Sequence, residues 1–306
     1  MAPLEQRRLG RTEMRPKAMG MGGAWWQAHP ASETIAAIER AIDLGIDFFD
    51  TYPGEFEARW GEALSGGKRE QVYLQGKVSS AVNNERTSDH SAAKTRSSLE
   101  ASLKSLRTDY LDSVLIHGYD KSEQLNQEGY FDPLGPGNAL DELIKMRDEG
   151  LIRHIGIGAR DADVINRATA TGEIEIVLTY MEYNLLTQAA AADFFPQCRE
   201  RDVGLILASP HGMGILTGDE PDDEAVAKRL QIEKPRANDM WKWCRDRSIN
   251  IRHMAIQFCM AAPDIDSIVL PGPASVQQLE EAYEAGTELI SAEVWRDFEA
   301  EFGIGV

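Results

Sequence analysis

Short apolar segments alternate with longer amphipathic segments along nearly the whole chain, and this alternation restricts the fold more than any other feature. Eight apolar segments predict buried β-strands, over residues 18–22, 48–50, 72–77, 113–117, 154–158, 176–180, 204–208 and 267–270. Strands made of consecutive apolar residues, each followed by a helix, are typical of a parallel sheet covered by helices. Eight such units predict an α/β fold, a closed (β/α)8 TIM barrel, rather than an open doubly wound sheet.

The segments between these strands show the spacing of amphipathic helices. Ile35, Ile38 and Ile42 share one face ahead of Gly45, a residue type that often ends a helix. The same periodicity predicts further helices over residues 188–201, 239–261 and 275–286. The spacing of the glycines after the first strand does not match GxGxxG, which argues against a Rossmann domain.

Both ends of the chain lie outside the repeating pattern. Residues 5–16 are expected to form an N-terminal hairpin that closes one end of the barrel, and residues 291–303 an extra C-terminal helix. No linker-like segment divides the chain, so we expect one domain over residues 1–306. The long loops at 118–136 and 214–235 follow strands, so function should lie at the C-terminal mouth of the barrel.

Composition excludes several classes of partner. The net charge of −18 argues against nucleic acid and against an anionic membrane surface, because both attract basic proteins. Three cysteines without CxxC spacing predict no disulfide framework and no metal site. The first residues lack the apolar stretch of a signal peptide. We therefore expect a soluble cytoplasmic protein, a monomer or small homo-oligomer, that acts on a small molecule.

Ionisable residues stand where three neighbouring strands are predicted to end. Asp50, Lys77 and His117 each follow an apolar run. Any one of them alone would more often be a surface charge or a satisfied core group. Three together must converge at one mouth of a barrel, which favours catalysis. Because an isolated buried lysine is costly, Lys77 requires an acid, and Asp50 is the neighbour that can supply it.

Tyr52 lies just beyond this pair, and together with the three residues above it forms a set whose acid–base chemistry is well understood. A neighbouring ammonium stabilises a phenolate, so a tyrosine beside Lys77 can donate or accept a proton. A neutral His117 opposite can orient and polarise a carbonyl oxygen. Such a set protonates the alkoxide formed when a carbonyl receives hydride, or deprotonates an alcohol that gives hydride up. It contains no source of hydride, which predicts a nicotinamide cofactor.

The chain resembles the aldo-keto reductases, and more closely their bacterial, sugar- or aldose-dehydrogenase-like branches. The resemblance rests on segments spread over nearly the whole length, among them RRLGRTEMRPKAMGMGG, IDLGIDFFDT, YLQGKV, SLEASLKSLRTDYLDSVLIH, VGLILASPHGMGILTG and VLPGPASVQQLEE. It implies an eight-fold barrel that binds NAD(H) or NADP(H) without a Rossmann fold. It also implies a catalytic tetrad of Asp, Tyr, Lys and His, which falls on Asp50, Lys77 and His117 with the tyrosine at or near Tyr52.

The resemblance also implies which residues hold the cofactor. The pyrophosphate is expected against Ser209, Gly212, Met213 and Gly214, and the adenosine against Gly272, Ser275 and Gln278. Relatives hold the carboxamide with Ser-Asn after strand five and Gln at strand six, whereas this chain offers Arg160 and Tyr180 at those places. The segment PGPASVQQLEEA contains no basic residue, so NAD is slightly favoured over NADP.

The motif around the expected tyrosine is altered. Relatives read DTxxxYGxSE, whereas this chain reads DTYPGEFE and is two residues shorter. Alignment from Asp50 places the tyrosine at Glu55, and alignment from the downstream FEARWGEAL places it at Pro53. Tyr52 is the nearest phenol and is the predicted proton donor. Glu55, with its pKa raised by burial, is the alternative.

Aromatic residues after the first strand suggest the substrate. Trp25, Trp26 and His29 are predicted to contact it, because aromatic faces with a few polar groups suit sugars, although tryptophans in loops equally serve as packing anchors. A sugar, a polyol, or a small aldehyde or ketone is expected. Two other hypotheses stay open: a redox-neutral, epimerase-like enzyme that keeps its nicotinamide, and a catalytically weak protein that binds cofactor and acts as a partner.

Overall fold

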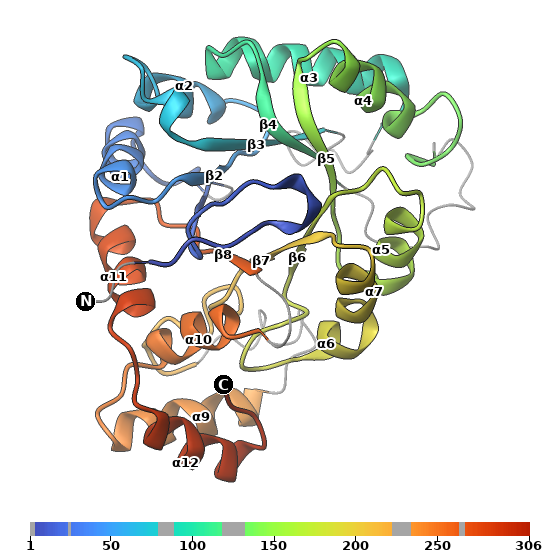
Figure 1. Cartoon of the computed structure of the whole chain (residues 1–306). Coiled ribbons are helices and arrows are strands. Elements are labelled where there is room, and N and C mark those ends of the chain that lie inside the picture. The colour runs from blue at the N-terminus through green and yellow to red at the C-terminus, as the bar shows by residue number, and fades with distance from the viewer. Residues whose placement is uncertain (1–3, 24–25, 79–88, 118–131, 222–233, 263–266) are drawn as a thin grey trace.

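A computed structural model describes residues 4–23, 26–78, 89–117, 132–221, 234–262 and 267–306. Eight parallel strands follow one another around the barrel in chain order (Figure 1). They are β1 (Met21–Gly22), β2 (Phe48–Asp50), β3 (Tyr73–Val78), β4 (Leu111–Ile116), β5 (Ile152–Gly158), β6 (Ile176–Tyr180), β7 (Gly204–Ala208) and β8 (Ser267–Leu270). The amide of Gly20 donates to Val269 O (2.9 Å), and Val269 donates to Ala18 O (2.9 Å), so the last strand lies beside the first. The predicted (β/α)8 architecture is confirmed.

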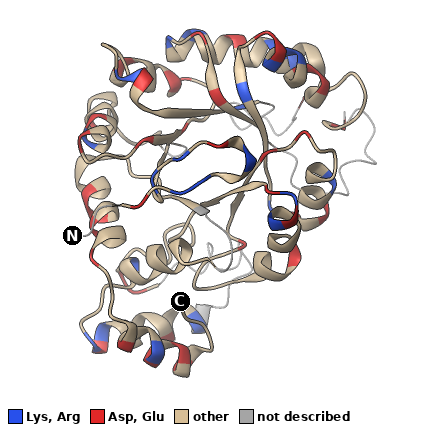
Figure 2. Cartoon of the chain, viewed as in Figure 1, with Lys and Arg blue, Asp and Glu red and all other residues tan. Residues whose placement is uncertain are grey.

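Helices surround this barrel on its outside, and both acidic and basic residues are distributed along them (Figure 2). They are α1 (Ala31–Asp43), α2 (Glu57–Ala63), α3 (Ala92–Leu106), α4 (Ala139–Asp148), α5 (Ala162–Thr169), α6 (Ala189–Asp193), α7 (Phe195–Glu200), α9 (Lys234–Asp246), α10 (Ile251–Met260), α11 (Val276–Thr287) and α12 (Ala292–Phe302). Among the described helices, none combines the length and the apolar character that crossing a bilayer requires.

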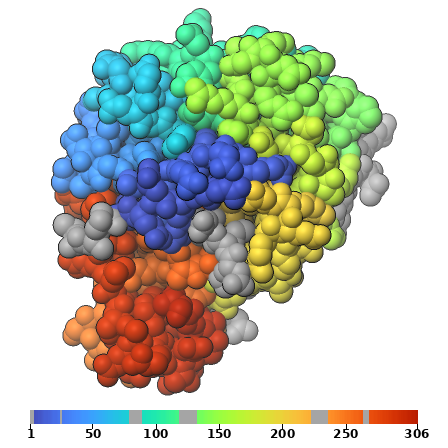
Figure 3. Space-filling model, in the orientation of Figure 1, coloured from blue at the N-terminus to red at the C-terminus, as the bar shows by residue number. Residues whose placement is uncertain are grey.

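The two segments outside the repeat are present. Residues 5–17 form an antiparallel hairpin, in which Arg7 N donates to Pro16 O (2.8 Å) and Leu9 N to Met14 O (2.9 Å). The hairpin contains the 3-10 turn η1 (Gly10–Thr12), and it covers the end of the barrel at which the strands begin (Figure 3). Helix α12 follows α11 at the C-terminus and lies beside α9 (Figure 1).

Two predicted helices are each broken in the structure. The segment 188–201 divides into α6 and α7 at Phe194, and Pro196 stands in the first turn of α7. The segment 239–261 divides into α9 and α10 because Ser248 adopts a left-handed conformation (φ 55°) and Asn250 caps the second helix through the amide of Arg252. Periodicity continues across both breaks, so it did not reveal them.

Strand register decides which side chains face the barrel interior. Asp50 on β2 is directly opposite Gln75 on β3, and Gln75 is opposite Ser113 on β4. Successive residues of a strand point to opposite faces, so Tyr73, Gln75 and Lys77 share the inner face of β3. The apolar part of the interior, which Leu9 and Met14 of the hairpin close from below, also contains Phe48, Leu115, Ile176, Leu178, Ile206, Ile268 and Leu270.

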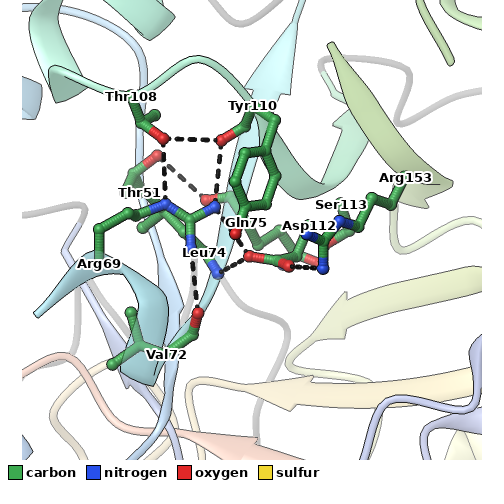
Figure 4. Close-up of polar contacts among 10 residues, drawn as sticks. All are labelled: Thr51, Arg69, Val72, Leu74, Gln75, Thr108, Tyr110, Asp112, Ser113 and Arg153. Atoms are coloured by element: carbon green, nitrogen blue, oxygen red, sulfur yellow. Dashed lines mark hydrogen bonds and ion pairs between the residues drawn. The ribbon is translucent and has the colours of Figure 1, made fainter. Parts of the chain in front are cut away.

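The outer faces of β3 and β4 are joined by a buried ion pair. Arg69, in the 3-10 turn η2 (Arg69–Gln71) before β3, donates from Nη2 to Asp112 Oδ2 over 2.9 Å, and the same oxygen accepts the amide of Leu74 (2.9 Å) (Figure 4). Arg69 also donates to the carbonyls of Val72 and Tyr110, both at 3.0 Å. Both terminal nitrogens of this guanidinium therefore donate hydrogen bonds where the two strands begin.

We expect Arg69→Met to lower the free energy of unfolding by about 3 kcal/mol, because it leaves Asp112 as a buried charge without its main partner. Urea denaturation measures this loss. Arg153→Met is the matched control: Arg153 Nη1 donates to Asp112 Oδ1 over 3.1 Å, but its side chain is 56% exposed. It should cost less than about 1 kcal/mol. Equal losses in the two variants would contradict this account.

Candidate active site

The site is built around a buried ion pair at the C-terminal end of β2 and β3. Lys77 Nζ donates to both carboxylate oxygens of Asp50, at 2.6 Å each, and to the carbonyl of Thr51 at 2.7 Å. Lys77 is 3% exposed and Asp50 8%. The three N–H groups of an ammonium are thereby all used, which is what makes a lysine tolerable at this depth. The predicted pairing of Lys77 with Asp50 is present.

Tyr52 and His117 lie against this pair. The centroid of the Tyr52 ring is 5.5 Å from Lys77 Nζ and 5.4 Å from the centroid of His117, with the two rings nearly perpendicular. Asp50 ends β2, Lys77 is the penultimate residue of β3, and His117 follows β4 directly. The four side chains predicted as catalytic are therefore brought together, while their roles remain predictions.

His117 is held as a neutral imidazole. Burial, and then the positive charge of Lys77, lower the pKa of His117 to about 3. Its Nδ1 is buried and has no hydrogen-bond partner within the described residues. A Cβ at Gly158 on β5 would stand 3.0 Å from His117 Cδ2, so a glycine at that position leaves room for the ring. A neutral ring beside the phenol can orient a carbonyl oxygen by donating a hydrogen bond to it from the protonated ring nitrogen.

The burial expected of Glu55, the alternative proton carrier, is not observed, and a neighbouring carboxyl group is buried instead. Glu55 is exposed, so the burial on which that interpretation rested is absent. Glu57, the first residue of α2, is 2% exposed instead, and burial raises its pKa to about 7. It accepts from Gly54 N (3.4 Å) and so contacts the loop that carries Tyr52. The sequence contained a weak signal, because Glu57 is one helical turn from the buried Trp60.

The loop after β7 has an unusual backbone. Ser209, Gly212, Met213 and Gly214 all have positive φ, at 58°, 60°, 56° and 99°. Serine and methionine rarely adopt this conformation, and it tends to persist at functional sites. A Cβ added at Gly214 would meet nothing within 4 Å, so this part of the backbone is open to a ligand. The loop thus fits the predicted role of holding a pyrophosphate.

His211 lies in the same loop and is an additional polar group. Its Nε2 is buried without a hydrogen-bond partner among the described residues. Burial, and then Arg252, lower the pKa of His211 to about 4, so the ring is neutral near pH 7. Buried polar atoms are usually paired, and an unpaired one next to an open backbone is a candidate ligand contact.

The predicted adenosine residues lie at the start of α11. Ser275 Oγ accepts the amide of Gln278 (3.3 Å), and Gln278 Oε1 accepts the amide of Ala274 (2.8 Å). These reciprocal bonds cap the helix. Gly272 precedes it with open space, since the nearest atom to an added Cβ is Gly22 O at 3.9 Å. Both side chains therefore have a structural role whether or not a nucleotide binds there.

Arg160 and Tyr180, predicted near the carboxamide, come together at the ends of β5 and β6. The guanidinium carbon of Arg160 is 5.5 Å from the centroid of Tyr180. Arg160 also forms an ion pair with Glu182 (2.5 Å), which sequence reasoning missed. The left-handed Met181 (φ 69°) precedes Glu182, and no motif marks that turn in the sequence. The resulting group offers a hydrogen-bond donor and an acceptor side by side.

The predicted substrate residues have different environments. Trp25 lies outside the described residues. Trp26 is 1% exposed, stacks on Trp60 with 5.1 Å between centroids, and donates to Pro273 O (3.1 Å), so it has little surface for a ligand. His29 is partly exposed, with Nδ1 3.5 Å from Glu33.

Two curated proteins are similar to this chain over most of their length. L-galactose dehydrogenase of Arabidopsis thaliana is 29% identical over 309 residues, covering 95% of this chain and 91% of that protein. D-threo-aldose 1-dehydrogenase of a Pseudomonas species is 26% identical over 316 residues, covering 92% of each. Both names describe dehydrogenases of sugars.

A solved structure and a family model agree with these relatives. The holo form of an aldo-keto reductase from Bacillus halodurans superimposes with a TM-score of 0.77 over 98% of this chain and 96% of that one. At 20% identity, this likeness supports the fold alone. The model of the aldo/keto reductase family matches residues 18–300. Like these relatives the chain is an oxidoreductase, and it belongs to the aldo/keto reductase family.

Proposed function

We propose that the chain interconverts a carbonyl and an alcohol on a sugar or polyol, with NAD(H) preferred over NADP(H). The observation that carries the proposal is the convergence of a buried Lys77–Asp50 pair, Tyr52 and a neutral His117 at one end of the barrel. The names of the two sugar dehydrogenases support the substrate class. Hydride comes from, or goes to, the nicotinamide ring of a bound cofactor.

The tetrad then provides the proton and holds the oxygen. The Tyr52 hydroxyl gives a proton to the alkoxide during reduction, or accepts one from the alcohol during oxidation. Lys77 favours the phenolate through its charge, because its three N–H groups already donate to Asp50 and Thr51. The neutral ring of His117 orients the reacting oxygen. Asp50 keeps the ammonium fixed, so the positive charge stays close to Tyr52 during the reaction.

The cofactor would lie across the loops after β7 and β8. The open backbone at Gly214 and Gly272 suits phosphate groups, and the Arg160–Glu182 pair could meet the carboxamide. The preference for NAD rests on the lack of a basic residue in 271–281. The arginines that reach α11 are also neutralised there, since Arg40 pairs with Glu280 (2.8 Å) and Arg252 pairs with Glu281. A 2′-phosphate would find no free positive partner among these groups.

Tyr52→Phe tests the proton donor. We expect hydride transfer to slow by roughly 100-fold or more, while NADH binds with unchanged affinity, because only the hydroxyl is lost. Stopped-flow absorbance at 340 nm with a panel of aldoses, aldehydes and ketones measures the rate, and NADH fluorescence measures binding. Tyr73→Phe is the matched control, since Tyr73 starts the same strand as Lys77 and its hydroxyl accepts Arg15 N (3.3 Å). Normal turnover by Tyr52→Phe would show that the tetrad is wrongly assigned.

The same panel separates the competing functions. Steady turnover of free NAD(H) with an aldose would exclude both an epimerase that retains its cofactor and a protein that only binds it. Cofactor that remains bound through purification, without turnover of added NADH, would point to the epimerase. Binding of NADH without any reaction would point to the partner role.

Cofactor choice is tested by comparing kcat/KM and Kd for NADH and NADPH. We expect NADH to be favoured by roughly 10-fold, since the 2′-phosphate would lose a charge-assisted bond that an arginine could provide. Gln277→Arg, which places a guanidinium on the exposed first turn of α11, should reduce this preference. Strong discrimination in favour of NADPH by the unaltered chain would refute the proposal.

The state of His117 can be measured directly by NMR. With a pKa of about 3, its ring should not titrate from about pH 5 to pH 8. Its neutral form then persists across the working range and contributes no step to the pH profile of kcat. In Lys77→Met the pKa should rise, because a neighbouring positive charge is removed, but burial should keep it below the ordinary value near 6.5. A titration midpoint near 6.5 in the unaltered protein would contradict this assignment.

A further inference from the structure

A polar row crosses the barrel interior and ends at Asp50 of the site. It consists of Asp50, Gln75 and Ser113, which stand directly opposite one another on β2, β3 and β4. We propose that Gln75 is a positioning residue, which fixes the carboxylate of Asp50 and through it the ammonium of Lys77. The proposal rests on the proposed function, in which that ammonium acts on Tyr52. Gln75 belongs to none of the groups that the resemblance or the tetrad chemistry identifies.

The hydrogen bonds of the row run in one direction only. Gln75 Nε2 donates to Asp50 Oδ1 over 2.8 Å, and Ser113 Oγ donates to Gln75 Oε1 over 3.0 Å. A carboxylate only accepts, so the amide must turn its NH2 toward Asp50, and its oxygen then faces Ser113. Figure 4 shows Ser113 and Gln75 facing each other from adjacent strands. Gln75 and Ser113 are both fully buried, with 0% exposure, so water cannot replace either bond.

This arrangement determines the orientation of Asp50. Both oxygens of the carboxylate accept hydrogen bonds from the Lys77 ammonium. The Gln75 amide donates to Oδ1 as well, so Oδ1 is the oxygen directed toward Gln75. An amide stabilises the charged carboxylate without adding a charge or a titrating group of its own. Without it, Lys77 would be the remaining side-chain donor to Asp50 within the described part of the chain, and both partners could rotate. The position of the ammonium relative to Tyr52 would then be less well defined.

A purely structural role for Gln75 predicts different behaviour. If Gln75 only fills the barrel, its loss should lower stability and leave the chemistry of the folded enzyme intact. If it acts through Asp50, its loss should lower kcat with little change in KM, and the effect should vanish once Asp50 is altered. These two outcomes can be separated in the intact chain.

The test compares Gln75→Met, which keeps the unbranched shape, with Leu178→Met, an apolar change elsewhere in the barrel interior. The free energy of a hydrogen bond to a charged group corresponds to a factor of roughly 10 to 100 in an equilibrium constant. We expect Gln75→Met to lower kcat by that factor, with NADH affinity unchanged, and Leu178→Met to change kcat by less than about twofold. Asp50→Asn and the double variant Asp50→Asn/Gln75→Met should be equally slow, since Gln75 acts through the carboxylate.

Gln75→Glu provides a second variant that keeps the shape of the side chain. While the new carboxyl is protonated it can donate to Asp50, and once ionised it repels Asp50. Its kcat relative to the unaltered enzyme should therefore fall as pH rises. Other charged or titrating groups near the row include Lys77, Tyr52, His117, Tyr73 and His154. His154 lies opposite Ser113 and bonds to Glu175 (3.1 Å). They are the same in both proteins, so the ratio of the two profiles isolates position 75.

A readout independent of turnover keeps this inference separate from the proposed function. The buried ammonium of Lys77 should give a slowly exchanging signal in a 1H–15N spectrum of lysine side chains, assigned by its absence in Lys77→Met. We expect this signal to shift or broaden in Gln75→Met but not in Leu178→Met. If the unaltered chain reduces or oxidises no substrate, the proposed function fails, and the signal still tests Gln75. An unchanged signal, or a kcat within about twofold of the unaltered enzyme, would overturn the proposal.

Discussion

The ion pair between Lys77 and Asp50 is the interaction on which the rest of the site depends. Removing two charges from water is costly, and such a pair is tolerated only when its remaining hydrogen-bonding groups are satisfied. Here the ammonium uses all its N–H groups on Asp50 and Thr51, and Gln75 donates to the carboxylate. This is possible because parallel register places β2 and β3 with their ends together. The barrel therefore creates the site by aligning strand ends.

The two faces of β3 and β4 carry different kinds of interaction. The outer face carries an ion pair that joins the strands, and the inner face carries the polar side chains next to the site. On the outer face, Arg69 and Asp112 join the beginnings of the strands to each other and to η2. On the inner face, Ser113 donates to Gln75, and Gln75 donates to Asp50. Asp50 pairs with Lys77 at the C-terminal end of the barrel. Adjacent residues point to opposite faces, so Asp112 and Ser113 can serve these two purposes without conflict. Because Arg69 and Asp112 fix the beginnings of these strands, the C-terminal ends can hold the buried charges of Lys77 and Asp50 in a fixed geometry.

Sequence reasoning predicted the strands well because each is an apolar run between polar segments. It placed 48–50, 176–180, 204–208 and 267–270 with the bounds observed. It failed where tertiary contact decides the outcome. Glu55 and Glu57 cannot be distinguished without knowing which face of α2 packs inward. Gln75 was overlooked because a single polar residue in an apolar run has no motif, and its importance comes only from the register that pairs it with Asp50. The convergence of Asp50, Lys77 and His117 was predictable, since each lies at or next to the end of a strand, and their catalytic roles stay predictions.

The short loop after β2 holds the phenol through the neighbouring strand. Tyr52 follows Thr51, which is hydrogen-bonded directly to β3. Thr51 N and Oγ1 both donate to Gln75 O, at 2.8 and 3.0 Å, and Thr51 O accepts Lys77 Nζ at 2.7 Å. Thr51 is fully buried as well. The residue before the phenol is therefore fixed to the same strand that carries the ammonium, so Tyr52 and Lys77 share one rigid support. Under the proposed function, such a support would make proton transfer by Tyr52 less dependent on loop closure, because the sheet sets the distance between the phenol and the ammonium.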